Sequence, residues 1–156
     1  MITYFGTYGT TEKFAKDIAE LTGGDLFEIE PVVPYDKNTA HYEELAAYAK
    51  KERDGDTRPE IKTLPDVSKY DYIFIGYPIW WGEAPHIIYN LVESVSLKKK
   101  TVIPFCTSMS SGLGNSAGNL KQNAKISRKT KWLKGKNFFD IPTQKKVNQW
   151  IDSLKY

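Results

Sequence analysis

The fold is decided by an N-terminal stretch, Ile2-Thr3-Tyr4-Phe5-Gly6-Thr7-Tyr8-Gly9-Thr10-Thr11, that passes from apolar residues through a glycine- and threonine-rich loop. Apolar residues then recur at helical spacing from Phe14 to Leu21, and Gly23-Gly24 ends this pattern. A short strand, a tight loop and a helix in this order are typical of the first unit of a parallel α/β sheet.

The same alternation continues to the end of the chain. Strand-like patterns occupy residues 26–30, 70–76 and 101–106, and helix-like patterns occupy residues 40–53, 85–95, 116–124 and 147–154, the last with Pro142 near its start. Residues 54–66 are rich in turn formers and are expected to cross the surface, whereas residues 125–137 are basic and poorly patterned. Pro104 conflicts with the strand pattern around it, so we expect its partner strand to have parted there.

This alternation predicts an α/β fold with one domain over residues 1–156. Its core is a doubly wound, five-stranded parallel sheet, covered by helices on both faces to give three layers. In strand order 2-1-3-4-5 the loops after the first, third and fourth strands share one edge, where such sheets bind ligands.

The composition is that of a globular protein, with 26% charged and 40% hydrophobic residues. No apolar stretch is long enough to span a membrane, and Met1 runs directly into strand-like residues without a secretory leader. The single cysteine, Cys106, cannot form an internal disulfide and is interpreted as a buried structural thiol. We therefore expect a cytoplasmic protein.

Charge is distributed unevenly along the chain. Residues 1–97 hold 9 basic and 17 acidic residues, a net of −8, whereas residues 98–156 hold 13 basic and 2 acidic residues, a net of +11. A basic segment can contact nucleic acid or an acidic protein, but no nucleic-acid motif accompanies it, so a solvated lysine surface is the simpler interpretation.

Three loops carry the candidate binding residues. The first begins the first helix and offers uncapped backbone N–H groups to a phosphate, the second places two tryptophans where a flat aromatic ligand can stack, and the third offers backbone donors to that ligand's edge. The candidate cofactor-binding residues are Gly6, Thr7, Tyr8, Gly9, Thr10 and Thr11, then Pro78, Ile79, Trp80, Trp81 and Gly82, and finally Thr107, Ser108, Met109, Ser111, Gly112 and Gly114.

Each loop also has a purely structural interpretation. The first loop alone could be a tight turn capped by threonine, the tryptophans could be core or interface residues, and the third loop could be a flexible surface segment. The sequence does not distinguish which tryptophan would stack. His41 and His86 lack metal-ligand spacing, and no catalytic triad or metal site is predicted.

The chain resembles the short-chain flavodoxins over nearly its whole length. The matching segments include Thr22–Pro31, Arg58–Ile61, Gly76-Tyr77-Pro78-Ile79-Trp80-Trp81-Gly82 and Thr101-Val102-Ile103-Pro104-Phe105-Cys106-Thr107. The resemblance implies a domain that binds FMN without a covalent bond, at the three loops above, and passes electrons singly. One departure stands out: the family's first loop usually reads Ser/Thr-x-Thr-Gly-x-Thr, and this chain has Gly6 and Tyr8 at the first and third places.

The function expected from this resemblance is electron transfer between redox proteins met transiently, with no catalytic residue of its own. The partners would include neither nucleic acid nor membrane, and the protein would be a monomer or a weak dimer. Two alternatives remain open: an NAD(P)H-dependent FMN or quinone reductase on the same fold, and a non-redox interaction module that has lost FMN.

Overall fold

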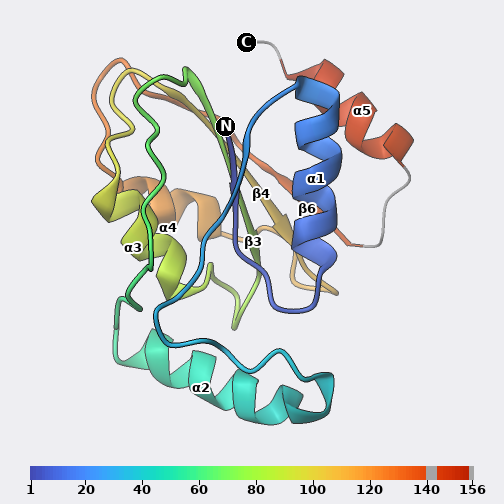
Figure 1. Ribbon diagram of the computed structural model, residues 1–156, viewed down its shortest axis with the longest axis vertical. Helices are drawn as coiled ribbons and strands as arrows, with labels where there is room; N and C mark the ends of the chain where they lie inside the picture. Colours follow the sequence, from blue (N-terminus) through green and yellow to red (C-terminus); the bar gives the residue numbers. More distant parts are fainter. Residues whose placement is uncertain (140–143, 155–156) are drawn as a thin grey trace.

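Strands and helices alternate along the chain in the computed structural model, which describes residues 1–139 and 144–154 (Figure 1). The strands are β1 (Ile2–Tyr4), β2 (Leu26–Glu28), β3 (Tyr72–Pro78), β4 (Thr101–Thr107), β5 (Lys131–Trp132) and β6 (Lys136–Phe138). The helices are α1 (Thr10–Thr22), α2 (Tyr42–Asp54), α3 (His86–Ser94), α4 (Ser116–Asn123) and α5 (Gln144–Ser153), and the 3₁₀ turn η1 (Thr39–His41) precedes α2. The predicted helices are confirmed, while Pro142 lies outside the described residues.

The strands form one parallel sheet in the order β2-β1-β3-β4-β5, with β6 also paired to β4. The predicted order is therefore confirmed. The fifth position is divided between two short strands, which the basic 125–137 segment did not reveal because neither is long enough to show an alternating pattern.

Pro104 explains why the fifth position is divided. The outer strands pair with β4 on either side of it, β5 at Thr101 and Val102 and β6 from Phe105 onward, whereas β3 stays in register through Ile75 and Pro104. Because proline has no N–H to donate, the ladder is interrupted on the outer side. The prediction that the partner strand has parted is correct on that side of β4 only.

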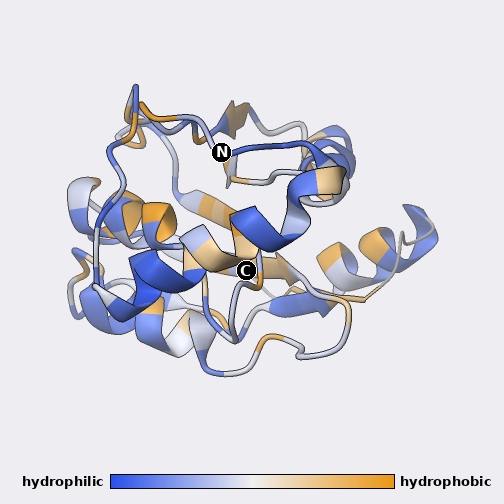
Figure 2. Ribbon diagram, turned by 90° about the horizontal axis from the view of Figure 1, so that it is seen from below, coloured by the Kyte–Doolittle hydropathy of each residue, from blue (hydrophilic) through white to orange (hydrophobic). Residues whose placement is uncertain are grey.

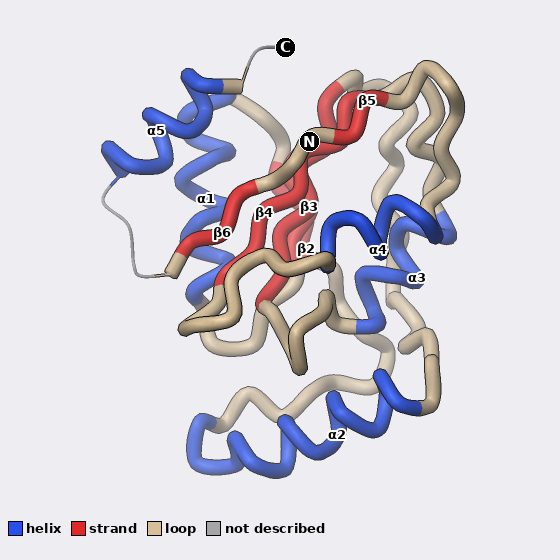
Figure 3. Tube along the Cα trace, turned by 180° about the vertical axis from the view of Figure 1, so that it is seen from behind, coloured by secondary structure: helices blue, strands red, loops and turns tan. Residues whose placement is uncertain are grey.

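Helices cover both faces of the sheet. Helices α1 and α5 lie on one face and α3 and α4 on the other (Figures 1 and 3). Each face has its own apolar cluster: Phe14, Ile18 and Trp150 belong to the first, and Ile87 and Leu91 to the second. Hydrophobic residues accordingly gather on the strands and on the inward sides of the helices (Figure 2). The predicted three layers are confirmed.

Helix α2 is placed differently from the other four. It lies beyond the carboxyl ends of the strands, below the sheet in Figure 1 and apart from both layers in Figure 3. Leu45 and Ala49 are its buried apolar contacts. The Tyr35 hydroxyl also donates to both carboxylate oxygens of Glu52 at 3.0 Å. The helix therefore borders the edge of the sheet where the three candidate loops lie.

The turn-rich segment 54–66 does more than cross the surface. Ile61 is buried and forms an isolated antiparallel bridge with Pro31, closed by two backbone hydrogen bonds of 2.8 and 2.9 Å. The prediction is wrong at this point because a lone apolar residue between turn formers carries no periodic signal.

The described helices include none that is both long enough and apolar enough to cross a membrane.

Close packing between β3 and β4 requires a glycine at position 76. A Cβ added to Gly76 would lie 2.2 Å from the Phe105 ring, which is fully buried between the sheet and α5. Real side chains do not approach this closely, so the ring or the strand would have to move.

We therefore expect Gly76→Ala to lower the free energy of unfolding by about 3 kcal/mol, at the upper end of overpacking costs. Gly118→Ala is the matched control, because a Cβ at this helical glycine meets no atom within 4 Å. It should stabilise the protein by about 0.8–1 kcal/mol through helix propensity. Urea unfolding followed by circular dichroism measures both, and equal stabilities for the two variants would contradict the packing argument.

Candidate functional site

The three candidate loops meet at the carboxyl edge of the sheet, at the lower end of β1, β3 and β4 in Figure 1. The hydroxyls of Thr11 and Thr107 lie 2.8 Å apart in a buried hydrogen bond between the first and third loops. The Ile79 N–H donates to the Thr107 carbonyl at 2.9 Å, which joins the second loop to the third. Residues up to 96 positions apart in the chain are thus brought together at one edge.

The first loop leaves the start of α1 open. Gly9 is the N-cap at φ 83°, and no side chain caps the helix. The first helical bond runs from Lys13 N–H to Gly9 O, so the N–H groups of Thr10, Thr11 and Glu12 have no acceptor among the described residues. Uncapped N–H groups and the helix dipole favour an anion at this point.

The side chains of the first loop divide into two sets. Thr7 and Thr11 are buried, while Tyr8, Gly9 and Thr10 are exposed. A hydroxyl carries one proton, so only one member of the Thr11–Thr107 pair keeps its proton for another acceptor. Thr10 is therefore the threonine whose hydroxyl this loop presents outward.

The departure from the family pattern at Gly6 has a local reason. A Cβ on Gly6 would lie 3.2 Å from Thr11 Cβ and 3.5 Å from Thr11 Oγ1. This spacing is tight, and Thr11 is fixed by its bond to Thr107. Glycine at position 6 thus leaves room for the hydrogen bond that joins the first loop to the third.

The second loop is a tight reverse turn over residues 80–83. Trp80 N–H donates to Glu83 O at 2.9 Å, and Glu83 N–H donates back to Trp80 O at 3.1 Å. Both central residues have positive φ, 52° at Trp81 and 81° at Gly82. Glycine tolerates this conformation, whereas a bulky residue adopts it at a cost, and such strain is concentrated at functional sites.

The two tryptophans have different surroundings. Trp80 packs edge-on against Phe5 and Tyr35, with ring centroids 5.4 and 5.3 Å away, so it belongs to the apolar cluster. The Trp81 side chain is 48% exposed. Because Trp81 is the more exposed of the two, it is the indole of this turn with more room for a ligand.

Helix α2 holds the Trp81 indole from one side. Trp81 Nε1–H donates to the Ala46 carbonyl at 2.8 Å, and Arg53 Nη1 donates to the Trp81 carbonyl at 3.2 Å. The Arg53 guanidinium also lies 5.7 Å from the centre of the indole ring. Sequence reasoning missed both contacts, because Ala46 and Arg53 are ordinary residues of an amphipathic helix and no motif marks them.

The third loop has the backbone of a tight, open turn. Gly112 and Gly114 have φ of 67° and 50°, and Ser108 Oγ accepts from the Gly112 N–H at 2.8 Å. Met109 is 95% exposed, and Ser111 is exposed as well. A Cβ on Gly114 would lie 3.7 Å from the Gly82 carbonyl, so the second and third loops adjoin.

A small apolar cavity opens between α2 and the first two loops. Its volume is about 200 Å³, and its lining is Tyr8, Tyr42, Leu45, Ala46, Ala49, Ile79, Trp80 and Trp81. Tyr8, at the second departure from the family pattern, thus faces α2 and the tryptophans. Pro78 ends β3 beside this group and is partly buried.

The cysteine and the histidines have structural surroundings. Burial raises the pKa of the Cys106 thiol to about 12, and its Sγ lies 3.1 Å from Asn137 Oδ1. His41 pairs with Asp36 at 2.6 Å, and His86 Nδ1 lies 2.9 Å from Thr57 O. Within the described ranges, no group of histidine, cysteine and acidic residues has the arrangement of a metal site.

Comparison with known proteins agrees with this architecture. A candidate flavoprotein of Bacteroides eggerthii DSM 20697 is 37% identical, with 97% of this chain and 94% of that chain covered and a TM-score of 0.83. A second, from Bacteroides uniformis ATCC 8492, is 33% identical, with 98% and 97% covered and a TM-score of 0.79. A flavoprotein of Lactobacillus acidophilus NCFM, solved in complex with FMN, shares the fold at 23% identity, with 96% of each chain covered and a TM-score of 0.69.

No curated protein matches the chain. A family model described as Flavodoxin matches residues 1–154, which include all three loops and every helix and strand of the sheet described above. The chain therefore belongs to the flavodoxin family.

Proposed function

We propose that this protein binds FMN at the carboxyl edge of the sheet and carries single electrons between redox proteins. The observation that carries the proposal is the junction of the three loops, fixed by the Thr11–Thr107 hydrogen bond. The related fold from L. acidophilus was solved with FMN bound, which supports the choice of cofactor.

The phosphate of FMN fits the start of α1. The free N–H groups of Thr10, Thr11 and Glu12 and the exposed Thr10 hydroxyl supply donors, and Gly9 leaves their approach open. Glu12 carries an opposing charge in this turn, and its ion pair with Lys16 at 2.5 Å reduces that charge. We expect backbone donors to supply most of the phosphate affinity.

The flat ring of FMN fits beside Trp81. The indole is half exposed and is held by α2 through its Nε1–H, so it can stack without first being ordered. Gly82, Gly112 and Gly114 keep side chains away from the ring edge. The Gly112 N–H donates to Ser108, whereas the N–H groups of Gly82 and Gly114 have no acceptor among the described residues. Bound FMN would supply the electron-accepting chemistry, and the residues around it would hold the ring and exclude water from one face.

The first test compares FMN with riboflavin, which lacks the phosphate. We expect FMN to bind the apoprotein in a 1:1 complex and riboflavin to bind at least 100-fold more weakly, because two or more charge-assisted hydrogen bonds would be lost. Quenching of flavin fluorescence measures both affinities. Equal affinities of FMN and riboflavin would show that the start of α1 does not bind the phosphate. If neither flavin binds, the result would favour an interaction module that has lost FMN.

The second test addresses the stacking residue. Trp81→Ala should weaken FMN binding about tenfold, from the loss of stacking and apolar contact. The fold should be kept, because the side chain is half exposed. Tyr72→Ala, an aromatic truncation at the opposite end of β3, is the matched control and should bind like the wild type. Unchanged affinity in Trp81→Ala would show that the indole does not contact the flavin.

An NAD(P)H-dependent reductase is the second candidate, and one observation favours it. The 200 Å³ cavity beside Trp81 is lined by apolar and aromatic side chains and has room for a small flat ring. Such a ring could belong to a nicotinamide or a quinone.

Anaerobic mixing of the FMN-loaded protein with NADPH separates these two functions. An electron carrier should show no bleaching of the flavin absorbance at 450 nm within minutes, because it has no site for the nucleotide. A reductase should bleach within seconds. Bleaching that saturates with NADPH would overturn the carrier assignment while leaving FMN binding intact.

A further inference from the structure

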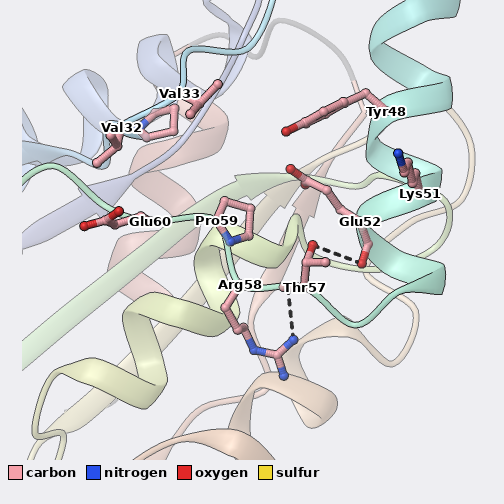
Figure 4. Close-up of a pocket in the computed structure, with 10 residues that line it drawn as sticks. Val32, Val33, Tyr48, Lys51, Glu52, Thr57, Arg58, Pro59 and Glu60 are labelled. Carbon is pink, nitrogen blue, oxygen red and sulfur yellow. Dashed lines mark hydrogen bonds between the residues drawn. The ribbon is translucent and has the colours of Figure 1, made fainter.

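A second cavity, of about 320 Å³, lies beside α2 (Figure 4). It is lined by Tyr48, Lys51 and Glu52 of this helix, whereas the helix residues that hold Trp81 are Ala46 and Arg53. Its walls are α2, residues 31–33 and residues 57–60. None of its lining residues belongs to the three loops, so it is separate from the proposed FMN site.

Hydrogen bonds hold the three walls in place. Val32 N–H donates to Glu60 O at 2.8 Å and joins the first wall to the third. Thr57 N–H donates to the Glu52 carbonyl at 3.0 Å, and the Thr57 hydroxyl lies 3.4 Å from the same atom, which joins the third wall to α2 (Figure 4). These hydrogen bonds therefore fix the positions of the three walls relative to one another.

The carboxylate of Glu52 points into this cavity, between Tyr48 and Pro59 (Figure 4). The residue is only 6% exposed, and the Tyr35 hydroxyl is its side-chain donor. No lysine, arginine or histidine of the described residues lies within 4 Å of it. A carboxylate accepts more hydrogen bonds than one hydroxyl supplies, and a buried one without a cation is costly. Burial accordingly raises the pKa of Glu52, although the Tyr35 hydrogen bond lowers it.

The nearby arginine does not neutralise Glu52. Arg58 Nε donates to Glu93 at 2.9 Å and its Nη1 donates to Asp56 at 2.7 Å. Figure 4 shows its guanidinium turned away from the cavity. Lys51 is exposed at the rim. The charge at the floor of the cavity is therefore unpaired with any cation of the described chain.

Apart from Lys51, Thr57 and Glu60, the exposed lining of the cavity is apolar or aromatic. Val32, Val33 and Tyr48 are 44%, 71% and 50% exposed, and Pro31 and Pro59 complete the lining between them. An apolar rim accepts the aliphatic stem of a long side chain, and a tyrosine face attracts a cation. The apolar rim therefore matches the aliphatic stem of a lysine or arginine side chain, and the buried carboxylate below it matches the cationic end.

We propose that this cavity is a docking site for a lysine or arginine side chain of a partner protein, with the cation on Glu52 and the stem against Val32, Val33 and Tyr48. The site lies in the part of the chain with net charge −8, so charge complementarity favours a basic partner surface. Helix α2 lines this cavity and also holds Trp81, which places a docked partner beside the carboxyl edge of the sheet.

The test uses ¹⁵N-labelled protein titrated with the peptide acetyl-Gly-Arg-Gly-amide, and with acetyl-Gly-Gln-Gly-amide as a neutral control. We expect saturable NMR shifts at the amides of Lys51, Glu52, Thr57 and Glu60 with the arginine peptide only. Glu52→Gln should weaken this binding about tenfold, because a charge-assisted hydrogen bond is lost. The variant should fold, because the amide oxygen still accepts from Tyr35.

Glu60→Gln is the matched control, since it removes one exposed carboxylate from the same cavity wall. Its affinity for the arginine peptide should stay within about twofold of the wild-type affinity. That difference in binding free energy is no larger than the contribution of one weak surface ion pair. Equal weakening in both variants, or shifts spread over the acidic surface, would overturn the proposal in favour of general charge attraction. Binding of n-butylammonium without binding of the peptide would also overturn it, in favour of a small-amine site. None of these outcomes depends on whether FMN binds.

Discussion

The buried hydrogen bond between the Thr11 and Thr107 hydroxyls is the contact on which the arrangement of the site depends. It joins the first turn of α1 to the end of β4 across the edge of the sheet, and glycine at position 6 leaves room for it. Because the Thr107 carbonyl also accepts from Ile79, one residue connects all three loops. Parallel pairing of β1, β3 and β4 brings these loops close, and the threonine pair fixes their spacing.

The sequence predicted most of the fold because strong periodic signals mark most of its elements. The apolar run before Gly76 and the helical spacing after Phe14 gave the layers, and the three loops gave the strand order, because that order brings them to one edge. The division of the fifth strand at Pro104 was not predictable in full, since strands of two and three residues are too short to alternate. The position of α2 was missed for another reason: amphipathic spacing shows that a helix has a buried side but not what that side contacts.

The candidate site was predictable to the level of loops but not of individual side chains. Motif spacing located the glycines and tryptophans, and tertiary packing then distinguished Trp80, in the core, from Trp81, on the open edge. Thr11 is among the predicted cofactor-binding residues, yet its hydroxyl bonds to Thr107 within the protein. Arg53 and Glu52 carried no signal at all, because a charged helix residue acquires a role only through the residues that meet it in space.

The charge asymmetry of the chain acquires a spatial meaning in the fold. The basic residues Lys98 to Lys100 directly precede β4. A second basic segment, residues 125–131, is held at the same end of the sheet, because the Lys131 N–H donates to the Lys100 carbonyl and the Leu97 N–H donates to the Lys125 carbonyl. This end is opposite the three loops, so the lysines of these two segments do not surround the proposed flavin edge. In the electron-transfer role proposed above, a redox partner would approach that edge and would meet α2 and the acidic N-terminal part of the chain. The proposed role would therefore favour a partner with a basic surface at the carboxyl edge, even though the whole chain is net positive.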